Sequence, residues 1–276
     1  MIRIITDSAA DLEPAEYARL QVTCIPLTVM FGEDEYQETV DLSKDRFYRL
    51  LESAEHAPKT AQASPQILLE LFEDAVAHGD EAIYITLSSQ LSGTYQNACM
   101  IRDEVGSDRC HVLDSRNATG GQRILVEYAA KLRDEGHTAA EIVEMVGGLR
   151  DRIVLYACMD TMEYLYRGGR ISHTAYTLGS LAQIKPIIKV QDGRVEVPTK
   201  AMGMRKGMEF LCKRLDVYKP SAEFPFYVMY TDVRANGELL AERLGMDIPP
   251  ERIINVGAAI GSHVGPNACG LVYVSE

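Results

Sequence analysis

The sequence predicts an α/β protein of two closely packed domains, with a parallel sheet in residues 1–150 and a mixed sheet in residues 151–276. Short β-rich runs alternate with helical segments up to about residue 150, a pattern typical of a parallel sheet flanked by helices. Beyond that point, Asp192-Gly193 stands between two β-rich runs, which is a strong signal for an antiparallel hairpin. The length of 276 residues suits two medium-sized domains, and no low-complexity linker separates them.

In the first half, four strands are expected from short runs rich in β-forming residues, at residues 2–5, 24–30, 83–87 and 111–113. Pro26 within the second run indicates an edge or a bulge, and residues 59–63 are expected to form a loop. Side chains that cap helices place the helices between these strands, with N-caps at Asp11, Ser43, Ser64 and Thr138. A helix also begins near Thr94, and a helix at residues 121–135 should stop at Gly136, because glycine favours the left-handed backbone after a helix.

In the second half, a short helix containing Tyr164 to Arg167 ends at Gly168-Gly169. Strands are expected at residues 153–157, 185–190, 194–198, 226–230, 252–256 and 271–274. Residues 257–270, GAAIGSHVGPNACG, read as a glycine-rich segment that carries His263. A histidine among glycines does not belong to an apolar face, and it is more often a ligand contact or a proton donor than a core residue.

The composition excludes several classes of protein. A net charge of −12 argues against nucleic acid or an anionic membrane surface as the main partner. No apolar run approaches the roughly 20 residues of a membrane span, and the N-terminus lacks the long apolar region of a signal peptide. Six cysteines without a C-x-x-C pair fit reduced thiols in the cytoplasm better than disulfides or a metal site.

The stretch IYITLSSQLSGTYQNA, residues 83–98, is the one around which the chain is organised. A strand here leads into a helix through a hydroxyl-rich loop, so the N–H groups and hydroxyls of Ser92, Gly93 and Thr94 lie at the carboxyl edge of the sheet. Open α/β sheets bind ligands at this edge, and a helix N-terminus favours an anionic group. An ordinary turn with a serine N-cap explains the same residues equally well.

Other polar residues fall where strands end or in neighbouring loops. Asp114 is expected to be structural, whereas Asp7, Ser8 and Ser262 are kept as further candidates for the site. A cation after the Gly168-Gly169 turn, Arg170, is by itself most simply a surface charge. Ser92, His263 and Asp7 could be combined into a hydrolase triad, but any long chain offers three such residues. Walker A, G-x-S-x-G and H-E-x-x-H motifs are absent from the sequence.

Taken together, these motifs resemble the DegV family of bacterial fatty-acid-binding proteins over essentially the whole chain. The residues that carry the resemblance are, in order, Thr6 to Leu12, Pro26-Leu27, Lys59 to Gln62, Leu87 to Tyr95, Asp114 to Arg116, Tyr164 to Ser172, Lys185-Pro186 and Gly261 to Pro266. Among them, Leu91-Ser92-Gly93-Thr94-Tyr95 and Gly168-Gly169-Arg170-Ile171-Ser172 are the most specific.

The resemblance implies a DegV-like fold with one long-chain fatty acid buried between the two domains. It also implies a FakB-type subunit, which presents the acyl carboxylate to a separate ATP-dependent fatty-acid kinase and has no catalytic residue, metal or cofactor of its own. Thr60 and Ser92, with Gly93, match the residues that hold the carboxylate. Arg170 and His263 match polar residues around the head group, facing the phosphate or the kinase.

Three positions depart from the family pattern, and two other functions stay open. Ala61 stands where serine is usual, Asn267 where glycine is usual and Met202 where arginine is frequent. The first alternative function is a Ser/His esterase or thioesterase that acts on acyl chains. The second is a small-molecule kinase related to the dihydroxyacetone-kinase subunits, which rests on analogy of fold.

Overall fold

The N-terminal part of the computed structural model, which describes residues 1–177 and 183–276, is built on a parallel sheet. Its strands lie in the order β2 (Val22–Ile25), β1 (Ile2–Asp7), β6 (Glu81–Thr86) and β7 (Cys110–Asp114). Strand β6 of the organising stretch is central and pairs with both β1 and β7. The expected alternation of strands and helices and the parallel sheet are therefore confirmed.

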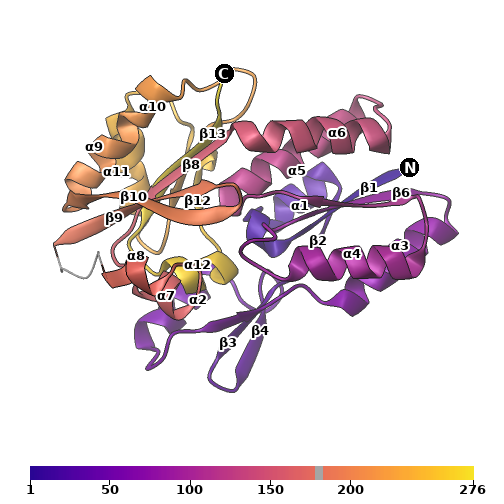
Figure 1. Cartoon of the computed structure of the whole chain (residues 1–276), viewed down its shortest axis with the longest axis horizontal. Coiled ribbons are helices and arrows are strands. Elements are labelled where there is room, and N and C mark those ends of the chain that lie inside the picture. Colours follow the sequence, from indigo (N-terminus) through magenta and orange to yellow (C-terminus); the bar gives the residue numbers. More distant parts are fainter. Residues whose placement is uncertain (178–182) are drawn as a thin grey trace.

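Helices cover both faces of this sheet (Figure 1). On one face, α3 (Pro65–Ala77) and α4 (Thr94–Val105) pack on Ile5 and Tyr84. On the other, α5 (Thr119–Asp134) and α6 (Ala139–Leu149) pack on Ile4 and Ile83. The same apolar cluster continues into the second large sheet, so α5 lies between the two sheets. The capping box that starts α6 and the left-handed Gly136 after α5 are as predicted.

The C-terminal part holds a mixed sheet. Its strands are β10 (Arg194–Met202), β9 (Ile184–Gln191), β8 (Ile153–Cys158), β13 (Cys269–Val274), β11 (Tyr227–Tyr230) and β12 (Ile253–Asn255), in that spatial order. Only the β11–β12 pair is parallel among these described strands, and Asp192-Gly193 forms the tip of the expected hairpin. The predicted domain boundary near residue 150 falls between the strands of the two large sheets, and this division stays a prediction.

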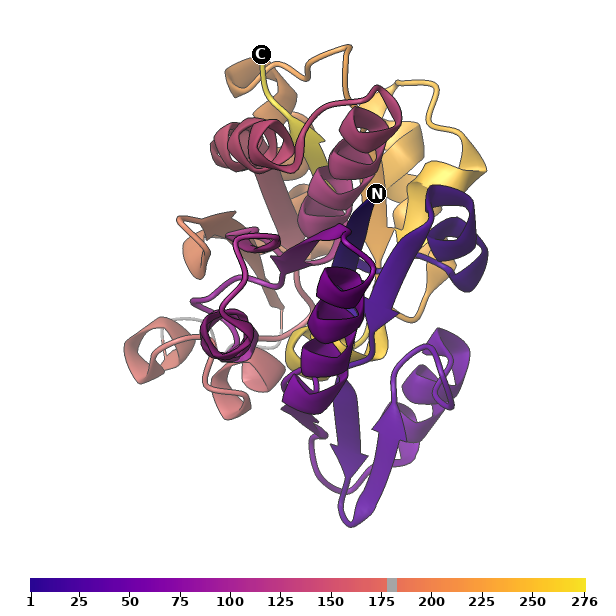
Figure 2. The same cartoon turned by 90° about the vertical axis from the view of Figure 1, so that its right-hand side faces the viewer.

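A third, antiparallel sheet was not expected. It consists of β4 (Asp34–Gln37), β3 (Thr28–Phe31) and β5 (Lys59–Ala61), and Figure 2 shows this region projecting from the body of the protein. The single strand predicted at 24–30 is wrong, because the chain breaks at Pro26-Leu27 into β2 and β3, which join different sheets. The loop predicted at 59–63 contains β5, whose partner is the distant strand β3.

The remaining elements are short helices around these sheets. They are α1 (Pro14–Leu20), α2 (Lys44–Ser53), α7 (Glu163–Arg167), α8 (His173–Thr177), α9 (Met204–Cys212), α10 (Arg214–Val217), α11 (Arg234–Leu244), α12 (Ala258–Val264) and the 3-10 turns Ser8–Ala10, Arg150–Arg152 and Pro250–Arg252. Asp11 does not cap α1 as predicted, because it follows the turn Ser8–Ala10 with a left-handed backbone, and Glu13 caps the helix instead.

The glycine-rich segment contains a helix that was not expected: residues 258–264 form α12, and His263 lies in its last turn. Gly261 within it allows a close approach to α2: a Cβ there would lie 2.7 Å from the ring of Phe47 and 2.9 Å from the hydroxyl of Tyr48. Glycine is therefore required here for packing between helices, although it lowers the helix propensity of the sequence.

Candidate functional site

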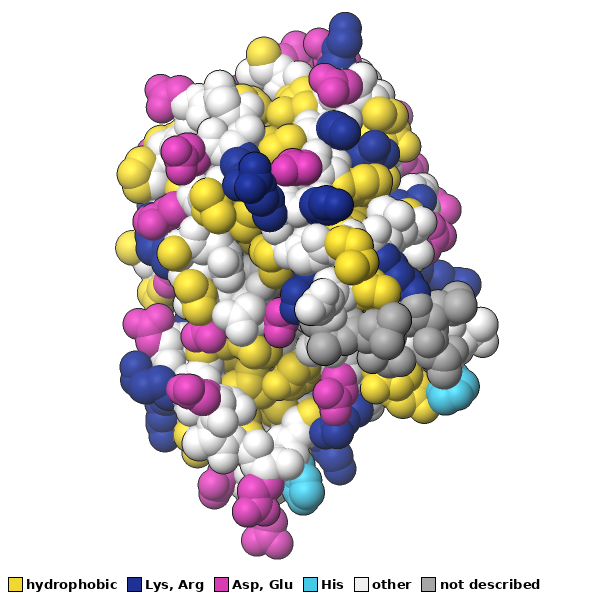
Figure 3. All heavy atoms as spheres, turned by 90° about the vertical axis from the view of Figure 1, so that its left-hand side faces the viewer, with side chains coloured by type: hydrophobic (Ala, Val, Ile, Leu, Met, Phe, Trp, Pro, Cys, Tyr) yellow, Lys and Arg dark blue, Asp and Glu magenta, His cyan; other side chains and the backbone are white. Residues whose placement is uncertain are grey.

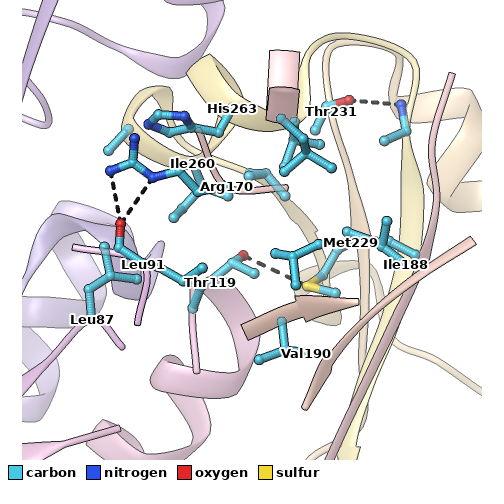
Figure 4. A pocket seen from close by; sticks show the side chains of 18 of the residues that line it. Leu87, Leu91, Thr119, Arg170, Ile188, Val190, Met229, Thr231, Ile260 and His263 are labelled. Carbon is cyan, nitrogen blue, oxygen red and sulfur yellow. Dashed lines mark hydrogen bonds between the residues drawn. The ribbon is translucent and has the colours of Figure 1, made fainter. Parts of the chain in front are cut away.

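A cavity of about 430 Å³ lies between the two large sheets and is walled mainly by apolar side chains (Figure 4). Both halves of the chain contribute to the wall, with Leu27, Leu87, Leu91, Leu155, Ile188, Val190, Val195, Met229, Val256 and Ile260 among the apolar residues. Cavities that bind small molecules are typically apolar with a few polar groups that fix orientation. The wall of this cavity has that composition.

All five residues expected at the primary site line this cavity: Thr60, Ser92, Gly93, Arg170 and His263. They come from four separate parts of the chain, so only the folded protein brings them together. The roles assigned to them from the sequence remain predictions.

Thr60 and His263 form one hydrogen-bonded pair. Thr60 Oγ1 lies 2.8 Å from His263 Nε2, which joins β5 to α12. Burial, followed by the nearby charge of Arg170, lowers the pKa of His263 to about 4. The imidazole is therefore neutral at neutral pH and acts as a hydrogen-bonding group. Gly168 makes room for it, because a Cβ there would lie 2.1 Å from Nδ1.

Arg170 is engaged with backbone rather than free. Its Nε and Nη2 donate to the carbonyl of Leu91 at 3.0 and 2.8 Å, and its Nη1 donates to the carbonyl of Gly168 (Figure 4). Leu91 belongs to the loop that carries Ser92 and Gly93. Arg170 thus ties this loop to the segment after α7, so its side chain has a structural role that the sequence did not indicate.

Ser92 and Gly93 lie immediately before α4. Ser92 Oγ shares a hydrogen bond with Thr94 Oγ1 at 2.9 Å and accepts one from the backbone N–H of Thr94 at 3.3 Å. Gly93 allows Gln62 to pack closely, because a Cβ at Gly93 would lie 2.7 Å from Gln62 Oε1. Hydroxyl donors at the start of a twelve-residue helix form a polar end to the cavity that suits a carboxylate.

Asp7, Ser8 and Ser262 do not line the cavity. The Asp7 carboxylate accepts hydrogen bonds from the N–H of Leu87 and from Gln122 at 2.8 and 3.0 Å, and burial raises its pKa to about 6. The hydroxyl of Ser8 donates to Glu38, and that of Ser262 donates to the carbonyl of Ala258 within α12. These three side chains support the fold around the site.

The hydrolase triad is not assembled. His263 Nε2 pairs with Thr60, the hydroxyl of Ser92 pairs with Thr94, and Asp7 is engaged with Leu87 and Gln122. A serine nucleophile needs its base within hydrogen-bond reach and that base oriented by the acid. The geometry therefore does not support the esterase alternative.

The polar wall residues that sequence reasoning missed include Gln62, Thr119 and Thr231. Thr119 starts α5 with a φ of 46°, a backbone conformation that is unusual for a β-branched residue, and its hydroxyl lies 3.7 Å from the sulfur of Met229. The helix was expected to begin at Gly121, and nothing in the sequence placed Thr119 in a wall. Gln62 was noticed only as part of a motif.

The three departures from the family pattern have clear positions. Ala61 lines the cavity and offers no hydroxyl there. Asn267 has a φ of 61°, which asparagine tolerates better than most residues other than glycine. Met202 is 58% exposed at the end of β10, on the surface of the protein.

Two buried carboxylates hold the start of α12, the helix that carries His263. Asp11 accepts from the N–H of Gly257 at 2.8 Å, and Glu38 accepts from the N–H of Ala259 at 3.1 Å. Residue 257 must be small, because a Cβ there would lie 2.3 Å from Glu38 and 2.6 Å from Asp11. Burial and the charge of Asp11 raise the pKa of Glu38 to about 7.

This raised pKa predicts a pH-dependent stability. Below about pH 4, Glu38 is protonated in both the folded and the unfolded protein. Between about pH 4 and pH 7, Glu38 is deprotonated in the unfolded chain but still protonated in the folded protein. The free energy of unfolding therefore falls over this range. In Glu38→Gln the fall between pH 5 and pH 8 should be smaller by about 1–3 kcal/mol, measured by urea denaturation. Glu35→Gln, an exposed change on the neighbouring ribbon, should keep the wild-type dependence; equal slopes in all three proteins would contradict the prediction.

Within residues 1–177 and 183–276, no helix has both the length and the apolar character needed to cross a bilayer. The same residues include no group of three or more His, Cys, Asp or Glu side chains arranged to hold a metal ion. On the face drawn in Figure 3, Lys and Arg side chains lie among acidic and hydrophobic ones.

Comparison with known proteins gives consistent matches over the full length. A family model described as "Uncharacterised protein, DegV family" matches residues 1–276. A DegV domain-containing protein of Caldanaerobacter subterraneus is 35% identical over 278 residues, covering 99% of this chain and 98% of the relative.

Solved structures show the same architecture. A DegV family protein from Thermus thermophilus, described for its fatty acid binding, is 28% identical with a TM-score of 0.88, covering 100% of this chain and 99% of its own. DegV from Bacillus subtilis, described as a fatty acid binding protein, is 26% identical with a TM-score of 0.85 at 100% and 99% coverage. Proteins described as binding fatty acids thus share the fold of this chain.

Proposed function

The chain belongs to the DegV family, and we propose that it binds one long-chain fatty acid in the cavity between its two large sheets. The observation that carries the proposal is the cavity itself: a mainly apolar wall that also includes Thr60 and Ser92 matches an acyl chain and its carboxylate. The related proteins from Thermus thermophilus and Bacillus subtilis, both described as binding fatty acids, support the same ligand.

In this proposal, Thr60, Ser92 and the backbone of Gly93 hold the carboxylate. A buried carboxylate must be hydrogen-bonded, or it takes up a proton and becomes neutral. The Thr60–His263 pair supports this arrangement: in the tautomer with its proton on Nε2, His263 donates to Thr60, whose own proton is then free to donate to the carboxylate. Arg170 keeps the loop of Ser92 in place through Leu91.

We further propose that the bound acid serves as substrate for a separate ATP-dependent fatty-acid kinase, which would form an acyl phosphate on the presented carboxylate. The family resemblance supports this step. The lack of a Walker A motif in the sequence agrees with a carrier that depends on another protein for ATP. The chain itself would then act as a lipid-binding subunit and not as an enzyme.

Protein purified from bacteria is expected to carry about one fatty acid per chain, because a large apolar cavity does not hold ordered water well. Denaturing extraction followed by mass spectrometry identifies and counts the acyl chains. A well-folded protein that yields none, and that shows no thermal shift with added fatty acid, would refute the proposal. Hydrolysis of a p-nitrophenyl acyl ester that disappears in Ser92→Ala would favour the esterase instead.

A further inference from the structure

The β9–β10 hairpin leaves the C-terminal sheet before it turns. Strand β9 pairs with β8 through Ile187, Ile188 and Lys189, whereas β8 continues along β13 as far as Ile153. From Val190 to Val195 the two hairpin strands pair with each other. A register shift in β10 between Glu196 and Thr199 accompanies this divergence, as expected for a bulge that bends a strand.

The separated part of the hairpin forms one wall of the cavity. Val190 and Val195 on the hairpin line it, and so does Leu155 on β8, next to the residues where the hairpin leaves the sheet. Figure 4 shows Ile188 and Val190 on one side of the cavity and Leu87 and Leu91 on the opposite side. The cavity therefore extends into the gap between hairpin and sheet.

Two side-chain hydrogen bonds fasten the tip of the hairpin to the N-terminal half. The hydroxyl of Ser88, which is fully buried, donates to the carbonyl of Gly193 at 2.7 Å. Arg194 Nε donates to Gln90 Oε1 at 2.9 Å on the surface. Gly193 is buried although both its neighbours in sequence are exposed, so the buried contact at the tip is the one between Gly193 and Ser88.

We propose that residues 190–195 are a strap over the bound ligand, that the Ser88–Gly193 hydrogen bond is its latch, and that ligand exchange requires the strap to lift. This inference rests on the proposed fatty-acid binding. Lifting the strap breaks the two hydrogen bonds at the tip and leaves the paired strands β8, β13, β11 and β12 intact. It also opens the cavity along its side, so an acyl chain can leave without unthreading end-on.

A reversible cross-link tests the strap directly. In Ser88→Cys/Gly193→Cys the two thiols are brought side by side, since a Cβ at Gly193 would lie 2.6 Å from the present Ser88 hydroxyl oxygen. Because the φ of 79° at Gly193 favours glycine, formation of the disulfide is first verified by thiol titration. The protein is loaded with a fluorescent fatty acid, and transfer to excess albumin is timed. Oxidation is expected to slow transfer at least about tenfold, because a covalent bond replaces one hydrogen bond, and reduction should restore the rate. The single variant Ser88→Cys under the same treatment is the matched control.

The variant Ser88→Ala gives the opposite test and does not depend on disulfide formation. This change removes the hydrogen bond to Gly193 and the one that Ser88 Oγ accepts from the N–H of Gln90. Loss of the bond to Gly193 should speed transfer about 2–10-fold while the protein still takes up one fatty acid per chain. Oxidised and reduced double variants that exchange ligand at the same rate, or an unchanged rate in Ser88→Ala, would overturn the strap and leave fatty-acid binding standing. A wild-type protein that takes up no fatty acid would instead refute the proposed function.

Discussion

Shortening the fatty acid from 18 to 12 carbons is expected to weaken its binding about 10³-fold or more. The six methylenes that are lost each contribute about 0.8 kcal/mol when transferred from water to an apolar wall, or about 5 kcal/mol together. The wall is apolar from Leu27 and Leu87 to Val190 and Val195, so the removed carbons lose no polar contact. Affinity is measured by competition with a fluorescent fatty acid, at ligand concentrations below those of micelle formation.

The matched control changes the head group and keeps the chain. An 18-carbon alcohol or methyl ester loses one hydrogen bond between a charged carboxylate and the polar groups of the cavity. The expected loss in affinity is therefore only about 10–100-fold, since a hydrogen bond to a charged group contributes about 1.5–3 kcal/mol. A protein that binds the 12-carbon acid as tightly as the 18-carbon acid, but not the 18-carbon alcohol, would show that the carboxylate and not the tail supplies the affinity.

Local signals in the sequence were sufficient wherever a segment's structure depends on its own residues. The capping box at Thr138, the serine N-caps at Ser43 and Ser64 and the Asp192-Gly193 hairpin all lie where they were predicted. In each case the side chain or turn residue satisfies backbone groups a few residues away. The parallel N-terminal sheet followed from the order of such segments.

Segments whose structure depends on distant partners were missed. Strand β5 is three residues long and is a strand only because β3 lies beside it. Helix α12 contains Gly261, which lowers helix propensity, and its first turn is held by Asp11 and Glu38 from the other end of the chain. The break between β2 and β3 likewise depends on distant partners, because the two strands pair within different sheets.

The site itself was found largely by resemblance, and its chemistry needed the structure. A sequence shows that His263 and Arg170 can carry charge, but not how far they are buried or which groups they meet. Burial makes His263 neutral, and the Arg170 guanidinium binds the carbonyl of Leu91. Arg170→Ala is therefore expected to weaken fatty-acid binding, because the loop of Ser92 loses its anchor.

His263→Ala is expected to leave fatty-acid uptake nearly unchanged and to slow acyl-phosphate formation by the partner kinase about 10²–10³-fold. The tail supplies most of the affinity, so loss of one group near the carboxylate matters little for binding. Phosphoryl transfer is more sensitive, because removal of one oriented hydrogen-bond donor typically costs that factor in rate. Without His263, the hydroxyl of Thr60 has no partner at 2.8 Å to direct its proton toward the carboxylate. Uptake is followed by fluorescence, and acyl phosphate is trapped with hydroxylamine.

The neutral state of His263 makes the prediction specific. With a pKa of about 4, the imidazole stays uncharged between pH 5.5 and pH 8, so the ratio of wild-type to His263→Ala rates should be constant over that range. His263→Gln, which can still donate one hydrogen bond to Thr60, should recover part of the lost rate, and Thr60→Val should reproduce the loss. If the ratio of wild-type to His263→Ala rates rises steeply as the pH falls through 6.5, the charged form of the imidazole promotes the reaction, which would contradict the prediction. Wild-type rates in His263→Ala would show that the pair only shapes the wall of the cavity.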